Sequence, residues 1–241
     1  MWRLGSLSIS FLLAGLVFSD SWDRQSFKNW SPEFARAILT HSPWAALLTI
    51  DQDEREPSPS SRPRRPGCAT CEEELMQSGV PEPTTPDFFS RKRHFLVRFQ
   101  TALPVRMALA RFAMLSGNMG PAEADDYVKA TPFGDHIVIA VWVPPGESKA
   151  ELDELVGQVP EDQVHLRLRR SKKKIAAKQI VTPLQAGDQE AYFVFPRLEN
   201  GKELVTVEEK EVEFVCHLSD SLTIKQKFKL KNMVFDGGLA L

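Results

Sequence analysis

Cysteine is scarce in this chain, with three residues among 241, so the sequence does not describe a disulfide-dense scaffold. A second long apolar run after the N-terminus is also absent, and we expect no transmembrane segment in the mature chain. Charge of one sign does not dominate: the formal net charge is −2, which is not the global signature of a polyanion-binding protein. The composition, 42% apolar and 26% charged, is that of an ordinary globular protein.

The common catalytic motifs are absent as well. The sequence contains no G-x-S-x-G, no H-E-x-x-H and no glycine-rich phosphate loop. Its histidines are scattered without the spacing of metal ligands, at His41, His94, His136, His165 and His217. We therefore predict no catalytic residue, no metal and no cofactor. A hydrolase-like enzyme stays open as the alternative, because a site assembled from distant residues needs no motif.

The N-terminus has the pattern of a secretory signal peptide. Arg3 is followed by an apolar run from Leu7 to Phe18. About a dozen residues are too few to span a bilayer, which takes ~20, but enough for the core of a signal. Small residues precede the Ser19–Asp20 bond, so we predict a signal peptide at residues 1–19. No cysteine follows the run, so a bacterial lipid anchor is not indicated, and we expect a soluble protein in the periplasm or outside the cell.

Residues 20–50 predict a short arm made of one helix and one strand. Ser31 is a good helix N-cap, Pro32 suits the first helical position, and Glu33 lies in the positive first turn. A strand is expected from Trp44 onward. Trp30 and Trp44 suggest either a ligand platform or, as we prefer, a staple that holds this segment on a core.

Residues 51–90 have the composition of a disordered linker. Seven of the seventeen prolines lie here, among mixed charges and few apolar residues. Such a segment cannot bury enough apolar surface to offset the entropy of ordering.

Residues 91–241 predict a globular α+β domain. We expect strands near 94–100, 136–143 and 164–170, helices near 103–115, 120–130 and 148–156, and later strands near 175–181, 191–196, 204–218 and 223–235. The early crossovers allow parallel pairing and the later hairpins are antiparallel. The expected architecture is thus a mixed sheet with helices packed on one face and a C-terminal antiparallel meander.

Three details of this domain are specific enough to check. The helix at 103–115 should bury Val105, Leu109, Phe112 and Leu115. Asn200-Gly201 should form a hairpin turn. In the last hairpin, a turn over 219–223 would pair Phe214 with Phe228 and place Cys216 near Gln226, as a small buried hydrophobe.

Three stretches carry a family resemblance: "SFKNWSPEFARAILTHSPWA", "FLVRFQTALPVRMALARFAML" and "FKLKNMVFDG". In these stretches the chain resembles a group of predicted exported bacterial proteins with no assigned function. The resemblance covers most of the mature chain and is weakest in the linker. It implies no activity, ligand or catalytic residue.

Cys68 and Cys71 form a C-x-x-C pair in the linker. No strand precedes the pair, and three glutamates follow it, which opposes the low thiol pKa of a redox site. Haem attachment needs a histidine where Glu72 stands. Zinc would need two more ligands, and Cys216 and His217 are adjacent on a strand and point to opposite faces. A local disulfide is the preferred interpretation, with redox and zinc roles less favoured.

The run from Arg167 to Lys174 holds six cations in eight residues: Arg167, Arg169, Arg170, Lys172, Lys173 and Lys174. A solvated hairpin end explains it most simply. If the run binds a ligand, we expect an anionic polymer or membrane surface, since the aromatic residues that stack on nucleic acid bases are missing. The sequence thus predicts a non-catalytic exported protein that binds or scaffolds an envelope partner, with no nucleic acid ligand.

Overall fold

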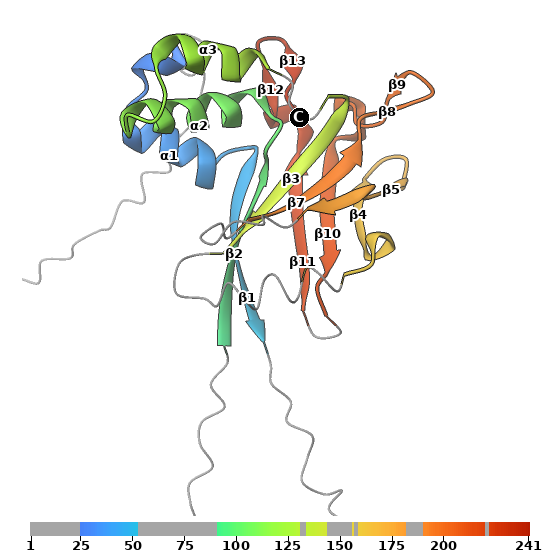
Figure 1. Ribbon diagram of the computed structural model, residues 1–241. Helices are drawn as coiled ribbons and strands as arrows, with labels where there is room; N and C mark the ends of the chain where they lie inside the picture. Colours follow the sequence, from blue (N-terminus) through green and yellow to red (C-terminus); the bar gives the residue numbers. More distant parts are fainter. Residues whose placement is uncertain are drawn as a thin grey trace, which may run out of the picture.

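The computed structural model describes residues 25–52, 91–130, 134–143, 156, 159–181, 190–219 and 222–241 (Figure 1). The predicted signal peptide, the linker beyond Gln52 with Cys68 and Cys71, and all but Val156 of the predicted helix near 148–156 lie outside these residues. Those three interpretations stay predictions.

The described residues form helices, strands and short 3-10 turns that alternate along the chain. The helices are α1 (Pro32–Thr40), α2 (Leu103–Leu115) and α3 (Pro121–Lys129), with 3-10 turns η1 (Phe27–Asn29), η3 (Glu161–Gln163), η4 (Val207–Glu209) and η5 (Leu230–Asn232). The strands are β1 (Ala45–Gln52), β2 (Arg91–Phe99), β3 (His136–Trp142), β4 (Val164–Leu168), β5 (Lys174–Ala176), β6 (Gln179–Val181), β7 (Glu190–Pro196), β8 (Leu198–Glu199), β9 (Lys202–Glu203), β10 (Glu211–His217), β11 (Thr223–Lys229), β12 (Val234–Phe235) and β13 (Gly238–Leu239). The α+β class and the C-terminal run of strands are confirmed.

The start of α1 follows the predicted capping chemistry. The Ser31 hydroxyl accepts a hydrogen bond from the amide of Phe34 at 3.1 Å, and Pro32 is the first helical residue. The cap matters because the first amides of a helix have no partner within the helix. Within the part of the chain that is described, none of the helices has the length and apolar character needed to cross a membrane.

Helix α2 buries the predicted face in part. Val105 is buried as expected, and Leu109 and Phe112 are partly buried against the core, but Leu115 is 42% exposed. Ala108 and Ala110, outside the predicted set, are fully buried. The helix contacts both α1 and α3, and Figure 1 shows the three lying together. Small alanine side chains let neighbouring elements approach closely, and the larger Leu109 and Phe112 pack against the core while remaining partly accessible.

The strands form a five-stranded sheet in the order β1-β2-β3-β7-β6 and a four-stranded sheet in the order β11-β10-β4-β5. Every ladder between described strands is antiparallel, so the predicted mixed sheet is wrong. The reason lies between β2 and β3. Two helices, α2 and α3, connect these strands, and a helix pair returns the chain to the end of the sheet that it left. A single crossover helix would have placed β3 parallel to β2.

The two large sheets pack face to face through phenylalanine rings. Phe99 lies 4.9 Å from Phe228, and Phe193 lies 5.4 Å from Phe214, measured between ring centroids. The first pair is edge-to-face and the second is tilted, and both avoid the unfavourable face-to-face stacking of aromatic rings. Strand β3 lies in the middle of the five-stranded sheet and is buried on both faces, as its uniformly apolar sequence predicts.

The last hairpin has the predicted faces but not the predicted register. Phe214 pairs with Gln226 and Cys216 with Ile224, two positions from the predicted partners. The ladder continues to Leu218, whose amide bonds the Leu222 carbonyl at 2.9 Å, so the turn is shorter than five residues. Leu222 is fully buried, which explains why it joins the strand rather than the turn. A shift of two residues leaves each side chain on its predicted face.

Two local predictions are confirmed. Asn200 and Gly201 have φ of 52° and 76° and join β8 to β9, the backbone geometry that a two-residue hairpin requires. Cys216 is a free, fully buried thiol, and burial raises its pKa to about 12.

Trp30 and Trp44 are buried in the core, which confirms the stapling interpretation. The indole of Trp44 donates to the carbonyl of Ala240 at 2.7 Å, and the guanidinium of Arg111 donates to the carbonyl of Trp30 at 2.8 Å. These bonds attach α1 and β1 to elements much later in the chain.

Candidate functional site

The basic run lies at one end of the four-stranded sheet, in β4, in the β4–β5 turn and at the start of β5. Four of its six cations have carboxylate partners: Arg167 with Glu213, Arg169 with Glu211, Arg170 with Glu208, and Lys173 with Glu199. Such pairs neutralise much of the positive charge that the sequence shows. The run is therefore not a cluster of free cations, and the structure places only part of it on a continuous surface.

The β4–β5 turn already contains an internal anion. The Glu209 carboxylate accepts hydrogen bonds from the amides of Arg170 and Ser171 at 3.0 and 2.9 Å. Burial alone would raise the pKa of Glu209, but the bonds from Ser171 and Arg170 outweigh it, and the pKa is lowered. The turn amides are thus occupied by the protein's own carboxylate.

The outward face of the four-stranded sheet extends the basic surface well beyond the run. Because side chains alternate along a strand, outward residues of paired strands form rows. One row crosses all four strands, from Lys227 through Glu213 and Arg167 to Lys174. In the next row Lys229 lies opposite Glu211, whose carboxylate is 3.5 Å from the Arg169 guanidinium.

We call this surface the basic face; its members are Lys225, Lys227, Lys229, Glu211, Glu213, Arg167, Arg169 and Lys174. Six cations and two carboxylates leave an excess of four positive charges, and both carboxylates lie on β10, between cations of the flanking strands. The neighbouring hollow, about 510 Å³, is lined by Arg169, Arg170, Lys172 and Lys210.

The pKa of His165 reflects the positive charge of this face. Its pKa is lowered first by burial and then by the nearby charges of Lys174, His217 and Arg167, with Glu213 opposing them. Protonation of His165 is disfavoured because the surroundings are already positive. The ring therefore adds no charge to the basic face at neutral pH.

Sequence reasoning missed the three lysines of β11 as site residues. Their alternation in "TIKQKFKLK" marks a charged strand face. What the sequence does not show is that β10 lies between β11 and β4, which brings residues 225–229 onto one surface with residues 167–174.

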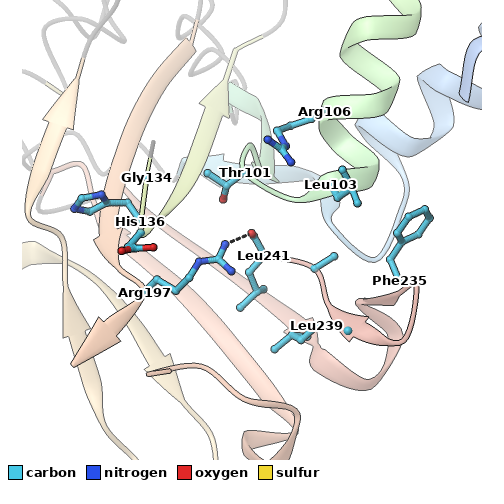
Figure 2. Close-up of a pocket in the computed structure, with 12 residues that line it drawn as sticks. Thr101, Leu103, Arg106, Gly134, His136, Arg197, Phe235, Leu239 and Leu241 are labelled. Atoms are coloured by element: carbon cyan, nitrogen blue, oxygen red, sulfur yellow. Dashed lines mark hydrogen bonds between the residues drawn. The ribbon is translucent and has the colours of Figure 1, made fainter. Parts of the chain in front are cut away.

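A second candidate site is a cavity of about 360 Å³ at the start of α2 and β3. Its apolar lining is Leu103, Phe235, Gly238, Leu239, Ala240 and Leu241, and its polar lining is Thr101, Arg106, Asp135, His136 and Arg197, with Gly134 at its edge. Figure 2 shows the guanidinium groups of Arg106 and Arg197 entering from different elements, while the ring of His136 points away from both.

The two arginines of this cavity differ in their hydrogen-bond partners. Arg197 donates to the backbone oxygen of Leu241. Arg106 donates through Nη1 to the carbonyl of Ala130, but its Nε is buried and has no hydrogen-bond partner. Burial lowers the pKa of Arg106, the nearby Tyr127 opposes that effect, and the charge of Arg197 lowers the pKa further.

A third polar cluster, between β2 and β7, is fully satisfied. Arg98 binds the Glu190 carboxylate through Nη2 and the Gln100 side chain at 2.9 Å, while the Tyr192 hydroxyl donates to Glu190 at 2.8 Å. Each charge has a partner of opposite sign, so we assign this cluster a structural role.

Metal and nucleophilic chemistry find little support in the described part of the chain. No group of three or more His, Cys, Asp or Glu side chains there is placed to hold a metal ion. The thiol of Cys216 is buried, and its raised pKa disfavours the reactive thiolate.

No family model matches the chain, and no curated protein matches it. One solved structure with some similarity is the crystal structure of a novel protein of unknown function from Burkholderia pseudomallei K96243. Its TM-score is 0.37 at 14% identity, over 55% of this chain and 72% of that chain. A similarity this weak assigns neither a fold nor a function, and membership of an exported bacterial family stays a prediction.

Proposed function

We propose that this chain is an exported, soluble, non-catalytic protein that binds an anionic polysaccharide outside the cytoplasm through its basic face. The observation that carries the proposal is the excess of four positive charges on one side of a four-stranded sheet. This local excess stands out because the whole chain has a net charge of −2.

The arrangement of the cations supports a repeating ligand rather than a single small anion. Neighbouring strands lie about 4.8 Å apart, and outward residues of one strand repeat about every 6.8 Å. Lys225, Lys227 and Lys229 therefore form a line of charges along the sheet edge, with Arg167 and Lys174 displaced across the strands. A polymer with regularly spaced carboxylate or sulfate groups can contact several of these cations at once.

The side chains missing from the basic face distinguish a polysaccharide from two other polyanions. None of its members is aromatic, so it offers nothing on which a nucleic acid base would stack. The exposed large apolar side chains of the described residues lie elsewhere, at Leu47, Leu115, Val181, Leu198, Val207 and Val234. On the same face Val215 lies between Lys225 and His165, but it is buried, so the basic face has no exposed large apolar side chain to insert into a lipid surface.

The test is binding of the full chain to immobilised heparin and polygalacturonate, measured across a salt gradient. The variant K225Q/K227Q/K229Q should bind roughly 100-fold more weakly at low salt, since each lysine near an anionic surface contributes about 1 kcal/mol and the three together about 3 kcal/mol. The matched control K92Q/K129Q/K202Q removes the same charge from exposed lysines outside the basic face.

Equal weakening by the two triple variants would mean that only net charge matters and would overturn the proposal. So would retention of the wild type on vesicles of 30% phosphatidylserine without retention on either polysaccharide, because the ligand would then be a membrane. Binding that rises with salt would exclude an electrostatic interface altogether.

Export is tested separately, by N-terminal sequencing of secreted or periplasmic protein from a bacterial host. The expected mature N-terminus lies near Asp20. Exported protein that retains Met1 would contradict cleavage, and it would leave the polysaccharide result unaffected.

A further inference from the structure

The cavity beside α2 contains a cationic group with an unmet hydrogen bond. The Nε of Arg106 is buried without a partner, and no described carboxylate forms an ion pair with this side chain. A buried guanidinium without an ionic partner carries a desolvation cost that an anion bound nearby would offset. Arg106 thus brings to the cavity a positive charge that no described Asp or Glu neutralises.

Other groups at the cavity also favour an anion. The second guanidinium, that of Arg197, lines the same space (Figure 2). The N-terminus of α2 lies there too, and its N-cap residue Ala102 provides no side-chain oxygen for the first amides. The positive end of the helix dipole therefore adds to the field of the arginines. Asp135 also lines the cavity, but among the described residues it forms no ion pair with either arginine, and its carbonyl accepts a hydrogen bond from the Arg197 amide.

The remaining wall is apolar. Leu103, Phe235 and Leu239 surround the space in Figure 2, and Ala240 and Leu241 complete it. A volume of about 360 Å³ lies at the small end of the range for ligand pockets. It suits a short hydrocarbon chain and is too small for a polymer.

We infer that this cavity binds a small organic anion, one carboxylate or phosphate group carried on a short apolar chain, with the anionic group between Arg106 and Arg197. The inference is independent of the basic face, which lies on the other sheet and has no apolar wall. It adds a small-molecule site to a protein whose proposed function is polymer binding.

Titration of the isotope-labelled full chain by NMR tests the inference. The probes are octanoate, octyl phosphate, inorganic phosphate and 1-octanol. Two resonances report on the cavity: the Nε–H of Arg106, and the indole N–H of Trp44, which bonds the lining residue Ala240. Octanoate or octyl phosphate should shift both, and their relative affinities identify the preferred head group. Octanol and inorganic phosphate, which each supply half of the ligand, should bind at least about tenfold more weakly.

Variants show whether the arginine is responsible. R106Q should weaken binding of the better probe by about tenfold or more, because a hydrogen bond to a charged group is lost. The control R36Q removes an exposed arginine from α1 and should bind like the wild type. K225Q/K227Q/K229Q should also bind like the wild type, which separates this site from the basic face.

A second variant, L103W, fills the cavity from its apolar side and should abolish the shifts even if R106Q proves poorly folded. No shift with any probe, equal binding by folded R106Q and wild type, or equal affinity for phosphate and octyl phosphate would each overturn the inference.

Discussion

The four-stranded sheet has two faces made by alternate residues of the same strands. One face is apolar and the other is charged. The inner face of β10 presents Phe214 and Cys216 to the aromatic core. The outer face presents Glu213 to cations on both flanking strands. Yet Glu213 is only 6% exposed, close to the residues of the inner face. Burial alone therefore does not distinguish core from surface here; the chemistry of the neighbours does.

The positive charge of the molecule is available to ligands in two different settings. On the basic face the carboxylates of Glu213 and Glu211 form ion pairs with Arg167 and Arg169, and the excess charge lies at the edge, on the lysines of β11. In the cavity beside α2, Arg106 and Arg197 line one space, and neither forms an ion pair with a described Asp or Glu. At the exposed site, many cations should each contribute little to the binding of an anion. At the buried site, few cations should each contribute much.

The largest expected difference between the faces is in the reactivity of Cys216. A pKa of about 12, against the ordinary 9.0, makes the thiolate about a thousandfold rarer near neutral pH. In the variant C68S/C71S, where only Cys216 remains, native protein should alkylate about a thousandfold more slowly than denatured protein, as measured by mass spectrometry. Fast labelling of folded protein, or a disulfide from Cys216 to Cys68 or Cys71 in the wild type, would show that the inner face is misassigned.

The next effect is on stability. Phe214→Ala removes a ring that contacts Phe193 and Phe195 and should lower the free energy of unfolding by about 3–5 kcal/mol. Lys227→Ala, on the outward face of the paired strand, should change it by no more than about 0.5 kcal/mol. Urea denaturation measures both. Similar losses in the two variants would mean that the faces do not differ in the way described.

A smaller effect is expected at Glu213. Glu213→Gln leaves Arg167 and Lys227 without their central carboxylate and should cost about 2 kcal/mol, less than a fully buried pair because Arg167 is half exposed. Glu208→Gln breaks the exposed pair with Arg170 and should cost under about 0.5 kcal/mol. If the two variants unfold at the same urea concentration, the carboxylate of Glu213 contributes no more to stability than the exposed carboxylate of Glu208.

The smallest effect is a dependence on alkaline pH. Because burial raises the pKa of Cys216, the folded state holds this proton more tightly than the unfolded chain. The resulting stability is complete below pH 9 and declines between pH 9 and 12. At pH 10 the wild type should have lost about 1 kcal/mol more than Cys216→Val, relative to each protein at pH 7. Parallel stability curves for the two proteins would contradict the link.

Local chemistry made part of this structure predictable. The Ser31 cap, the Asn200-Gly201 turn and the buried strand at 136–143 depend on neighbours within a few residues, and all three are confirmed. The predicted register of the last hairpin is wrong. Two registers that differ by two residues place every side chain on the same face, so alternation cannot separate them. The burial of Leu222 favours the register with the shorter turn.

The candidate sites were harder to predict for a related reason. The run at 167–174 was visible, but its carboxylate partners come from β8, η4 and β10. The lysines of β11 share a surface with this run because of the order of the strands in the sheet. The alternation of residues along each strand does not reveal that order. The cavity has no local signal in the sequence: Arg106 and Arg197 lie far apart along the chain and line the same cavity because α2 and the end of β7 reach the same edge of the fold.

The bond from Trp44 to Ala240 has a consequence for the order of events during synthesis. It joins residues 196 positions apart, and β1 must also wait for β2 before it has a partner. The N-terminal helix and strand therefore cannot complete their packing until nearly the whole chain has emerged. Folding that depends on such distant contacts is slow. Under the export that we propose, such slow folding would keep the translocating segment extended until the last residues have crossed the membrane.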